Sequence, residues 1–205
     1  MKGKLIAIEG PDGSGKTTQI ELLKEYFLKN NYEIICTREP GGTDISEKIR
    51  DIILDNNNSK MSSMCESLLY AASRAQLVNE VIKPAILEGK VVICDRFITS
   101  SIVYQGIARN LGIERIKGIN ECAVDGLKVD LTILISLDYE EGLKRKAKQK
   151  KLDRLESSGS EFHKKVFEGY MSAPMFCDDI KVIDGNRSIS DIHNDILSEI
   201  KKILV

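Results

Sequence analysis

The glycine-rich stretch at residues 10–18 constrains this chain more than any other part of its sequence. An apolar run at residues 5–8 precedes it, and a helical pattern at residues 19–28 follows it. Residues 10–17 match the Walker A or P-loop pattern, G-x-x-x-x-G-K-[ST]. Glycines at these positions allow the backbone to curl until successive N–H groups point into one concavity, which suits anionic oxygens. The motif therefore predicts a phosphate-binding loop between a strand and a helix.

The chemistry of the motif assigns roles to its side chains. The helix after Lys16 presents free N–H groups and the positive end of its dipole to the phosphates. Lys16 would bridge the outer phosphates, and the Thr17 hydroxyl would ligate Mg²⁺. The alternative is a glycine-rich turn without a ligand, but the flanking strand and helix are the context that the motif requires. The expected ATP-binding residues are Gly10, Pro11, Asp12, Gly13, Ser14, Gly15, Lys16, Thr17 and Thr18.

Strand and helix patterns alternate along the rest of the chain. Short apolar runs predict five strands, at residues 5–8, 33–37, 90–95, 131–137 and 180–183. Helical spacing falls at residues 19–28, 45–54, 64–87, 113–125, 139–150, 162–176 and 189–204, with a kink near Pro84 and a cap at Ser188 or Ser190. Residues 97–110 are expected to form a loop and a short helix, and residues 152–160 a mobile loop. The pattern predicts an α/β fold, a five-stranded parallel sheet with helices on both faces.

Length, charge and cysteine usage limit the classes of function. The 205 residues are expected to form a single domain over 1–205, with a lid segment at about 144–160. Lys and Arg number 30 against 31 Asp and Glu, which argues against a general nucleic-acid partner. We expect no membrane partner, because no apolar run approaches the ~18 residues of a span. Five scattered cysteines, expected to be mostly core residues, and the absence of a signal peptide predict a cytoplasmic location.

Charged residues just past the predicted strands suggest the chemistry. Ligands of such sheets bind beyond the carboxyl ends of the strands, where Asp12, Arg38, Asp95 and Asp138 should meet. Asp95 ends an apolar strand as a Walker B acid does, so it could hold Mg²⁺, or it could cap a turn. Arg38 and Arg96 could bind a second phosphate through their guanidinium forks, or form surface ion pairs. Two phosphate pockets with one metal suit phosphoryl transfer between nucleotides better than hydrolysis.

Three further features are ambiguous when each is taken alone. Tyr70 and Arg74 are one helical turn apart, so they could stack on a base and hydrogen-bond its edge, or belong to the core. Residues 100–106 combine polar and aromatic side chains where a loop meets a helix. The basic run at residues 144–151 could be a solvated helix face, or a lid that closes cations over the transferring phosphate and excludes water.

Taken together, these segments resemble the thymidylate kinase family over nearly the whole chain. The resemblance is specific because several motifs occur in order. They are the P-loop at residues 9–18, TREPGGT at 37–43, LYAASRAQ at 69–76, DRF at 95–97, Ser100-Ser101 with YQG at 104–106, and LDRLE at 152–156. The resemblance implies a P-loop nucleoside-monophosphate-kinase-like fold and the reaction ATP + dTMP → ADP + dTDP with Mg²⁺, a step of dTTP synthesis. It also implies a homodimer.

The resemblance also implies roles for individual residues. Arg38 and Arg96 would hold the 5′-phosphate of dTMP, and Asp12 would contact the sugar 3′-OH and the metal–phosphate region. Tyr70, where the family often has Phe, would stack on thymine. The remaining acceptor residues are Arg74 at the base carbonyl, Ser101 and Gln105 at the base edge, and Tyr104, which would crowd the 2′ position and disfavour ribonucleotides.

The source of the catalytic cation is the point where the sequence departs from the family pattern. Members carry an arginine inside the P-loop or supply a basic residue from the lid. Residues 12–14 here are Asp-Gly-Ser, so the chain resembles the lid type of bacteria, yet the position of the lid arginine falls near Gln149. The candidates are Arg145, Lys148, Lys150, Lys151 and Arg154. Together with Lys16, Arg96 and Asp12, we expect Lys148 or Arg154 in particular to act in catalysis.

Three other functions stay open from the sequence. Another nucleoside-monophosphate kinase would share the fold and differ in its acceptor. A P-loop ATPase or GTPase-type switch would need no second phosphate pocket, and the chain has no Asn-Lys-x-Asp motif for guanine. A nucleic-acid-binding P-loop protein would use the basic run at residues 144–151, against the overall charge balance.

Overall fold

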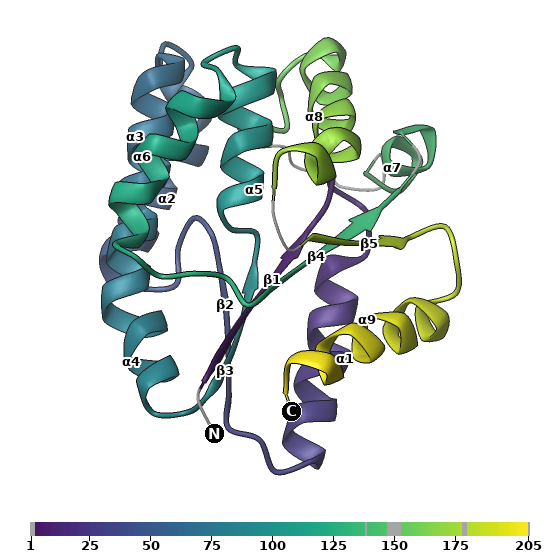
Figure 1. Cartoon of the computed structure of the whole chain (residues 1–205). Coiled ribbons are helices and arrows are strands. Elements are labelled where there is room, and N and C mark those ends of the chain that lie inside the picture. Colours follow the sequence, from purple (N-terminus) through teal and green to yellow (C-terminus); the bar gives the residue numbers. More distant parts are fainter. Residues whose placement is uncertain (1–2, 138, 147–152, 178–179, 205) are drawn as a thin grey trace.

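A single parallel sheet organises the molecule (Figure 1). The computed structural model describes residues 3–137, 139–146, 153–177 and 180–204. Its strands run in the order β2-β3-β1-β4-β5, and every neighbouring pair is parallel. Their bounds are β1 Lys4–Glu9, β2 Ile34–Arg38, β3 Val91–Asp95, β4 Leu131–Ser136 and β5 Ile180–Asp184. The predicted five-stranded parallel sheet is confirmed, and β1, which leads into the P-loop, lies at its centre.

Alternate residues of the strands pack on opposite faces of the sheet, as strand geometry requires. Ile6 and Ile8 of β1 join one buried cluster with α1 (Lys16–Lys29) and α9 (Ile189–Ile203). Leu5 and Ala7 join a second cluster with residues of α3, of the π-helical turn after it, of α4 and of α6. The bounds on this face are α3 Ser63–Leu77, η2 Val78–Ile82, α4 Lys83–Leu87 and α6 Ile113–Val124. Helices therefore cover both faces, as predicted (Figure 1).

The remaining helices stand around the carboxyl edge of the sheet (Figure 1). They are α2 Asp44–Leu54, α5 Ile98–Ser101, the π-helical η3 Ile102–Ala108, α7 Tyr139–Lys146 and α8 Ser160–Ser172, with short 3₁₀ turns at Asn56–Asn58 and Ala173–Met175. Val103 and Ala108 of η3 form a third buried cluster with Val166 and Tyr170 of α8. Because Gly169 faces Val103 so closely that a Cβ would lie 3.0 Å from its Cγ1, α8 is packed tightly on η3.

Two helical predictions are confirmed with a change in detail. Residues 63–87 are helical throughout. In place of the kink predicted near Pro84, the helix has a π-helical turn at residues 78–82, which ends just before Pro84. Proline has no N–H to donate to the preceding turn, so the local change of hydrogen bonding falls there. The predicted cap is Ser188, whose hydroxyl accepts from the Asp191 N–H at 3.1 Å.

The predicted loop and short helix at residues 97–110 was wrong, since residues 98–108 are helical without a break. β-branched residues such as Ile102 and Val103 disfavour helix slightly in isolation. Both are buried here, and this packing outweighs the propensity. The predicted loop at residues 152–160 is confirmed for residues 153–159, which form turns. It is anchored to the fold, because Leu155 is buried and the Arg154 N–H donates to the Leu54 carbonyl at the end of α2, and its mobility stays a prediction.

The cysteines differ from the expectation that most are core residues. Only Cys94 is buried, while Cys36, Cys65 and Cys122 are exposed, and all five are free thiols. A thiol is small enough to be tolerated at a helix surface or sheet edge, so cysteine content alone predicts burial poorly. Among the helices within the described residues, none is both long and apolar enough to cross a membrane.

Candidate functional site

The P-loop lies at the carboxyl end of β1 and leads directly into α1. Gly10, Gly13 and Gly15 all have positive φ, at 144°, 81° and 91°. Gly10 is needed for space as well, because a Cβ there would lie 2.5 Å from the Ile135 carbonyl oxygen. Lys16 is buried, and its ammonium donates to the carbonyls of Gly10 at 2.9 Å and Pro11 at 3.0 Å. The local chain thus has the curl and the cation that phosphate binding requires.

Asp95 and Thr17 fit a divalent cation beside this loop. Asp95 ends β3 directly opposite Ile8 of β1, and both Asp95 and Thr17 line the pocket. The Oδ1 atom of Asp95 is buried and has no hydrogen-bond partner among the described residues. A buried carboxylate oxygen is costly to leave unpaired. Carboxylate and hydroxyl oxygens are the ligands that Mg²⁺ takes in nucleotide sites, so the residues fit the expected metal.

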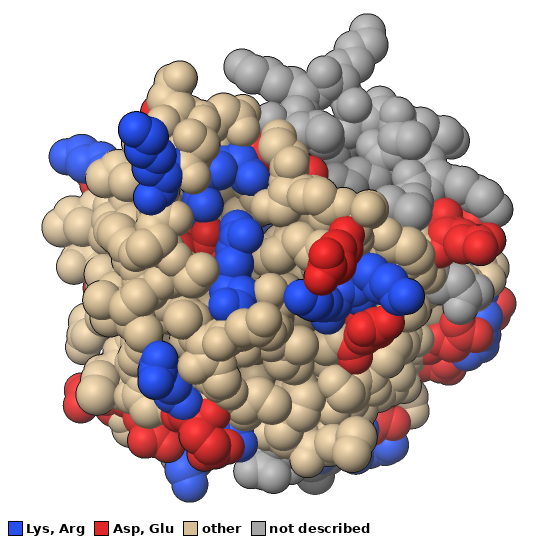
Figure 2. Space-filling view, turned by 90° about the horizontal axis from the view of Figure 1, so that it is seen from above, with Lys and Arg blue, Asp and Glu red and all other residues tan. Residues whose placement is uncertain are grey.

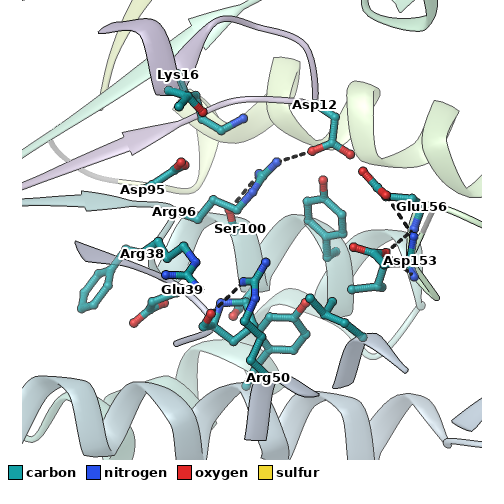
Figure 3. A pocket seen from close by; sticks show the side chains of 18 of the residues that line it. Asp12, Lys16, Arg38, Glu39, Arg50, Asp95, Arg96, Ser100, Asp153 and Glu156 are labelled. Carbon is teal, nitrogen blue, oxygen red and sulfur yellow. Dashed lines mark hydrogen bonds and ion pairs between the residues drawn. The ribbon is translucent and has the colours of Figure 1, made fainter. Parts of the chain in front are cut away.

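Arg96 occupies the centre of the site (Figure 3). Its φ of +67° is in the left-handed region, which turns its side chain back over the P-loop. Nη1 donates to the Gly10 carbonyl at 2.9 Å and to the Tyr170 hydroxyl at 2.6 Å, while Nη2 donates to Asp12 at 2.6 Å. Among the described residues nothing accepts from Nε, so one edge of the guanidinium is available for an anion.

A second arginine, Arg74, is fixed deep in the pocket wall. It is almost completely buried and pairs with Glu39 through Nε and Nη2. Nη1 donates to Ser101 at 3.0 Å and to the Asn120 side chain. Burial raises the pKa of Glu39, and the charge of Arg74 opposes that rise. Ser101, expected at a base edge, thus holds the arginine that was expected to meet the base.

The cavity between these groups has a volume of about 520 Å³ and is lined by all seven predicted substrate residues. Arg38, Tyr70, Arg74, Arg96, Ser101, Tyr104 and Gln105 all line it. Arg38 also pairs with Glu47 at 2.9 Å, and Gln105 donates to the buried Glu66 at 3.0 Å. Burial raises the pKa of both Tyr70 and Tyr104, so both hydroxyls stay protonated at neutral pH. In the view from above, onto the end of the molecule where the strands end, basic side chains gather in a hollow near the middle (Figure 2).

The predicted lid candidates separate into three groups. Lys148, Lys150 and Lys151 lie outside the described residues, as does Asp138. Arg145 of α7 pairs with Glu141 and donates from Nη1 to the Gly13 carbonyl of the P-loop at 3.3 Å. Arg154 donates to the Ile53 carbonyl and pairs with Glu66 at 2.8 Å, and Glu66 also accepts from the pocket residue Gln105. Neither arginine is among the residues that line the pocket, but Arg145 is the described candidate in contact with the P-loop.

Several residues of the site have no strong signal in the sequence. Arg50 lines the pocket and donates to the Pro40 carbonyl at 2.8 Å, although a charge on a helix normally indicates a solvated face. Asp153 and Glu156 line the pocket from a turn that follows the basic run. They lie inside the quoted LDRLE motif, which was the available clue. Glu9, the first residue of the quoted P-loop motif, and Tyr170 are both buried near Arg96, and Tyr170 resembles a core residue in the sequence.

The fold and the pocket together define a P-loop phosphotransferase of the nucleoside-monophosphate-kinase type. The cleft is lined by the P-loop with its lysine and by several arginines and aromatic rings. Comparison with known proteins gives the family: the family model described as thymidylate kinase matches residues 8–196. The chain belongs to the thymidylate kinase family.

Curated relatives agree over the full length. The chain is 53% identical to the thymidylate kinase of Thermoanaerobacter sp. (strain X514) over 205 residues, which is 100% of both chains. It is 47% identical to the thymidylate kinase of Finegoldia magna over 197 residues, covering 96% of this chain and 97% of that one. It is 47% identical to the thymidylate kinase of Clostridium novyi, covering 98% and 99%.

Lys16 gives the site a testable pH dependence. Burial, together with the charge of Arg96, lowers its pKa to about 8, although Asp95, Asp12 and Glu9 oppose the shift. Bound phosphates stabilise the charged ammonium, so ATP binds the protonated form better. We predict that the affinity for ATP, measured by titration calorimetry without acceptor, falls as the pH rises through about 8, by up to about tenfold per pH unit.

The Lys16→Met variant is the control for this titration. It removes the titrating group, so its weaker affinity for ATP should not change over the same pH range. A wild-type affinity that is constant through this range, or a variant that keeps the slope of the wild type, would contradict the assignment.

Proposed function

We propose that this chain transfers the γ-phosphate of ATP to dTMP, giving ADP and dTDP, by direct in-line attack within one cleft. The observation that carries the proposal is the Gly10 carbonyl oxygen, which accepts from both Lys16 Nζ and Arg96 Nη1 at 2.9 Å. Lys16 belongs to the donor side and Arg96 to the acceptor side. Because the two cations converge on one backbone oxygen, the phosphates they bind would be neighbours, as direct transfer requires.

The reaction needs positioning and charge compensation more than proton transfer. The phosphate oxygen of dTMP is already anionic near neutral pH, so little base catalysis is required. Lys16 and Arg96 would offset the negative charge on the transferring group from its two sides. Thr17 and Asp95 would hold Mg²⁺, which supplies further positive charge next to the donor phosphates. Asp12, which pairs with Arg96, would orient the acceptor sugar and contact the metal–phosphate region.

The acceptor base would be selected by the wall that contains Arg74. Glu39 and Ser101 fix this guanidinium before any ligand arrives, so little conformational entropy is lost when a base carbonyl accepts from it. Tyr70 would stack on the thymine ring, Gln105 would contact the base edge, and Tyr104 would crowd the 2′ position of a ribonucleotide. Arg38 would assist Arg96 at the 5′-phosphate, since both line the same cavity.

The choice of acceptor monophosphate tests the base assignment directly. The test is ADP release from ATP·Mg²⁺ with dTMP, dUMP, dGMP, dCMP, UMP, AMP or no acceptor. We expect release with dTMP, weaker release with dUMP, and little with the others. A preference for a different monophosphate would contradict the base assignment, and release that ignores all acceptors would contradict the kinase proposal.

Arg145 is the described lid candidate that we propose as the catalytic cation, because it contacts the P-loop through Gly13. An added cation at the transferring phosphate contributes on the order of 10³-fold or more to the rate. We predict that Arg145→Ala lowers kcat by at least about 10²-fold with KM for ATP and dTMP little changed.

Lys165→Ala is a matched control, because it breaks a similar i,i+4 surface pair, with Glu161, on α8. It should leave kcat unchanged. If Arg145→Ala keeps kcat within about threefold of the wild type, the catalytic cation comes from another residue.

We also propose that the chain acts as a homodimer in the reducing cytoplasm. Ile45 and Ile52 of α2 and Leu68 of α3 are about half exposed on two helices that pack together, which supports a partner on that face. The five free thiols, three of them exposed, are compatible with a reducing compartment. Sedimentation velocity at micromolar protein tests the dimer directly.

A further inference from the structure

Tyr170 lies directly behind Arg96, although it comes from a helix far along the chain. It belongs to α8, is completely buried, and packs edge-on against Tyr104 with 6.2 Å between ring centroids. Its hydroxyl accepts from Arg96 Nη1 at 2.6 Å and lies 2.7 Å from the Ser100 hydroxyl. The hydroxyl also donates to Glu9 at 3.2 Å. One phenol oxygen therefore connects the central arginine to a buried carboxylate.

Glu9 anchors this arrangement from the end of β1. Its carboxylate accepts from the Phe97 N–H at 2.7 Å, the Ser100 N–H at 3.1 Å and the Ser100 hydroxyl at 2.6 Å. These bonds fix the turn that follows Arg96, whose backbone is in the left-handed region. The carboxylate is thus occupied with holding the turn, and two hydroxyls connect it to the guanidinium. The Tyr170 hydroxyl accepts from Arg96 Nη1 at 2.6 Å, and the Ser100 hydroxyl accepts from it at a longer 3.3 Å.

The two ends of the Arg96 guanidinium have different surroundings. Nη1 is directed at three acceptors of the protein itself: the Tyr170 hydroxyl at 2.6 Å, the Gly10 carbonyl at 2.9 Å and, less closely, the Ser100 hydroxyl at 3.3 Å. Nε, for which the described residues offer no acceptor, and the second hydrogen of Nη2 form the edge that binds a phosphate in the bidentate manner. A guanidinium is rigid and planar, so fixing Nη1 fixes the direction of that edge.

We propose that the Tyr170 hydroxyl is a positioning group for the acceptor phosphate: it holds the Nη1 end of Arg96 so that the Nε–Nη2 edge faces the 5′-phosphate of the monophosphate. The inference rests on the proposed function, because it requires Arg96 to be a phosphate ligand. Tyr170 acts through Arg96 and does not touch the substrate.

The protonation of the hydroxyl is consistent with this role. Burial raises the pKa of Tyr170 well above its usual value, which keeps the phenol neutral over the working pH range. A neutral phenol can accept from Arg96 with a lone pair while its own hydrogen goes to Glu9 or Ser100. Burial also raises the pKa of Glu9, although Ser100 and Arg96 lower it.

The test compares two ligands that differ only in the phosphate. Dissociation constants for dTMP and thymidine are measured by calorimetry on the wild type and on Tyr170→Phe, which keeps the ring and its packing. A hydrogen bond to a charged group typically changes affinity by about tenfold or more. We expect the variant to bind dTMP about tenfold more weakly, with thymidine affinity unchanged and with KM for dTMP raised in the same proportion.

Tyr139→Phe is the matched control. It removes a hydroxyl that donates to the Ser160 carbonyl at the start of α8, the helix that also contains Tyr170. This hydroxyl has no bond to Arg96, so the affinities for dTMP and thymidine should stay as in the wild type. Thermal unfolding of each variant gives the accompanying change in stability.

Two results would overturn the positioning role alone. If Tyr170→Phe weakens dTMP and thymidine equally, the hydroxyl acts only on the general structure of the pocket. If it weakens neither, the hydroxyl has no role in binding. A wild type that binds thymidine as well as dTMP, and releases no ADP with dTMP, would overturn the proposed function together with this inference.

Discussion

The placement of β1 between β3 and β4 is the constraint on which the rest of the site depends. In a parallel sheet all carboxyl ends meet at one edge, so the strand order decides which side chains become neighbours. The register puts Ile8 beside Asp95, and the residues that follow these two positions are the P-loop and Arg96. A donor loop and an acceptor arginine thus lie together because two buried apolar strands pair, and loop flexibility is not needed to assemble them.

Electrostatic balance is the second requirement of this arrangement. Lys16 and Arg96 share the Gly10 carbonyl, and their mutual repulsion contributes to the lowered pKa of the lysine. Asp12, Asp95 and the buried Glu9 surround the pair and offset its charge. Arg74 is compensated separately by Glu39. The cleft therefore concentrates cations where phosphates would bind, without leaving a large unpaired positive charge in the folded protein.

The parts of the site that the sequence predicts are those set by local chain geometry. The P-loop, Asp95 and Arg96 each follow an apolar strand directly, and strand ends place side chains with little help from the rest of the fold. Tyr70 and Arg74 share a helix face by simple periodicity. The sequence therefore predicts the sheet, its covering helices and most of the cavity lining.

What the sequence does not predict depends on packing between distant segments. The pairs Arg74–Glu39, Arg154–Glu66 and Tyr170–Glu9 join residues that lie 35, 88 and 161 positions apart. No periodicity indicates such partners. Arg154 shows the consequence: its motif suggests a cation over the nucleotide, yet packing against α2 and α3 turns it toward Glu66. The helical run at residues 98–108 was missed for the same reason, because its β-branched residues gain more from burial than they lose in propensity.

Direct transfer between two adjacent phosphates is the central claim, and steady-state kinetics test it most directly. Initial rates are measured while ATP and dTMP are both varied. If both nucleotides occupy the cleft together, double-reciprocal plots at different dTMP concentrations intersect. Parallel lines would indicate that ADP leaves before dTMP binds and that the protein itself carries the phosphate. That result would contradict a mechanism built on Lys16 and Arg96 converging at one carbonyl.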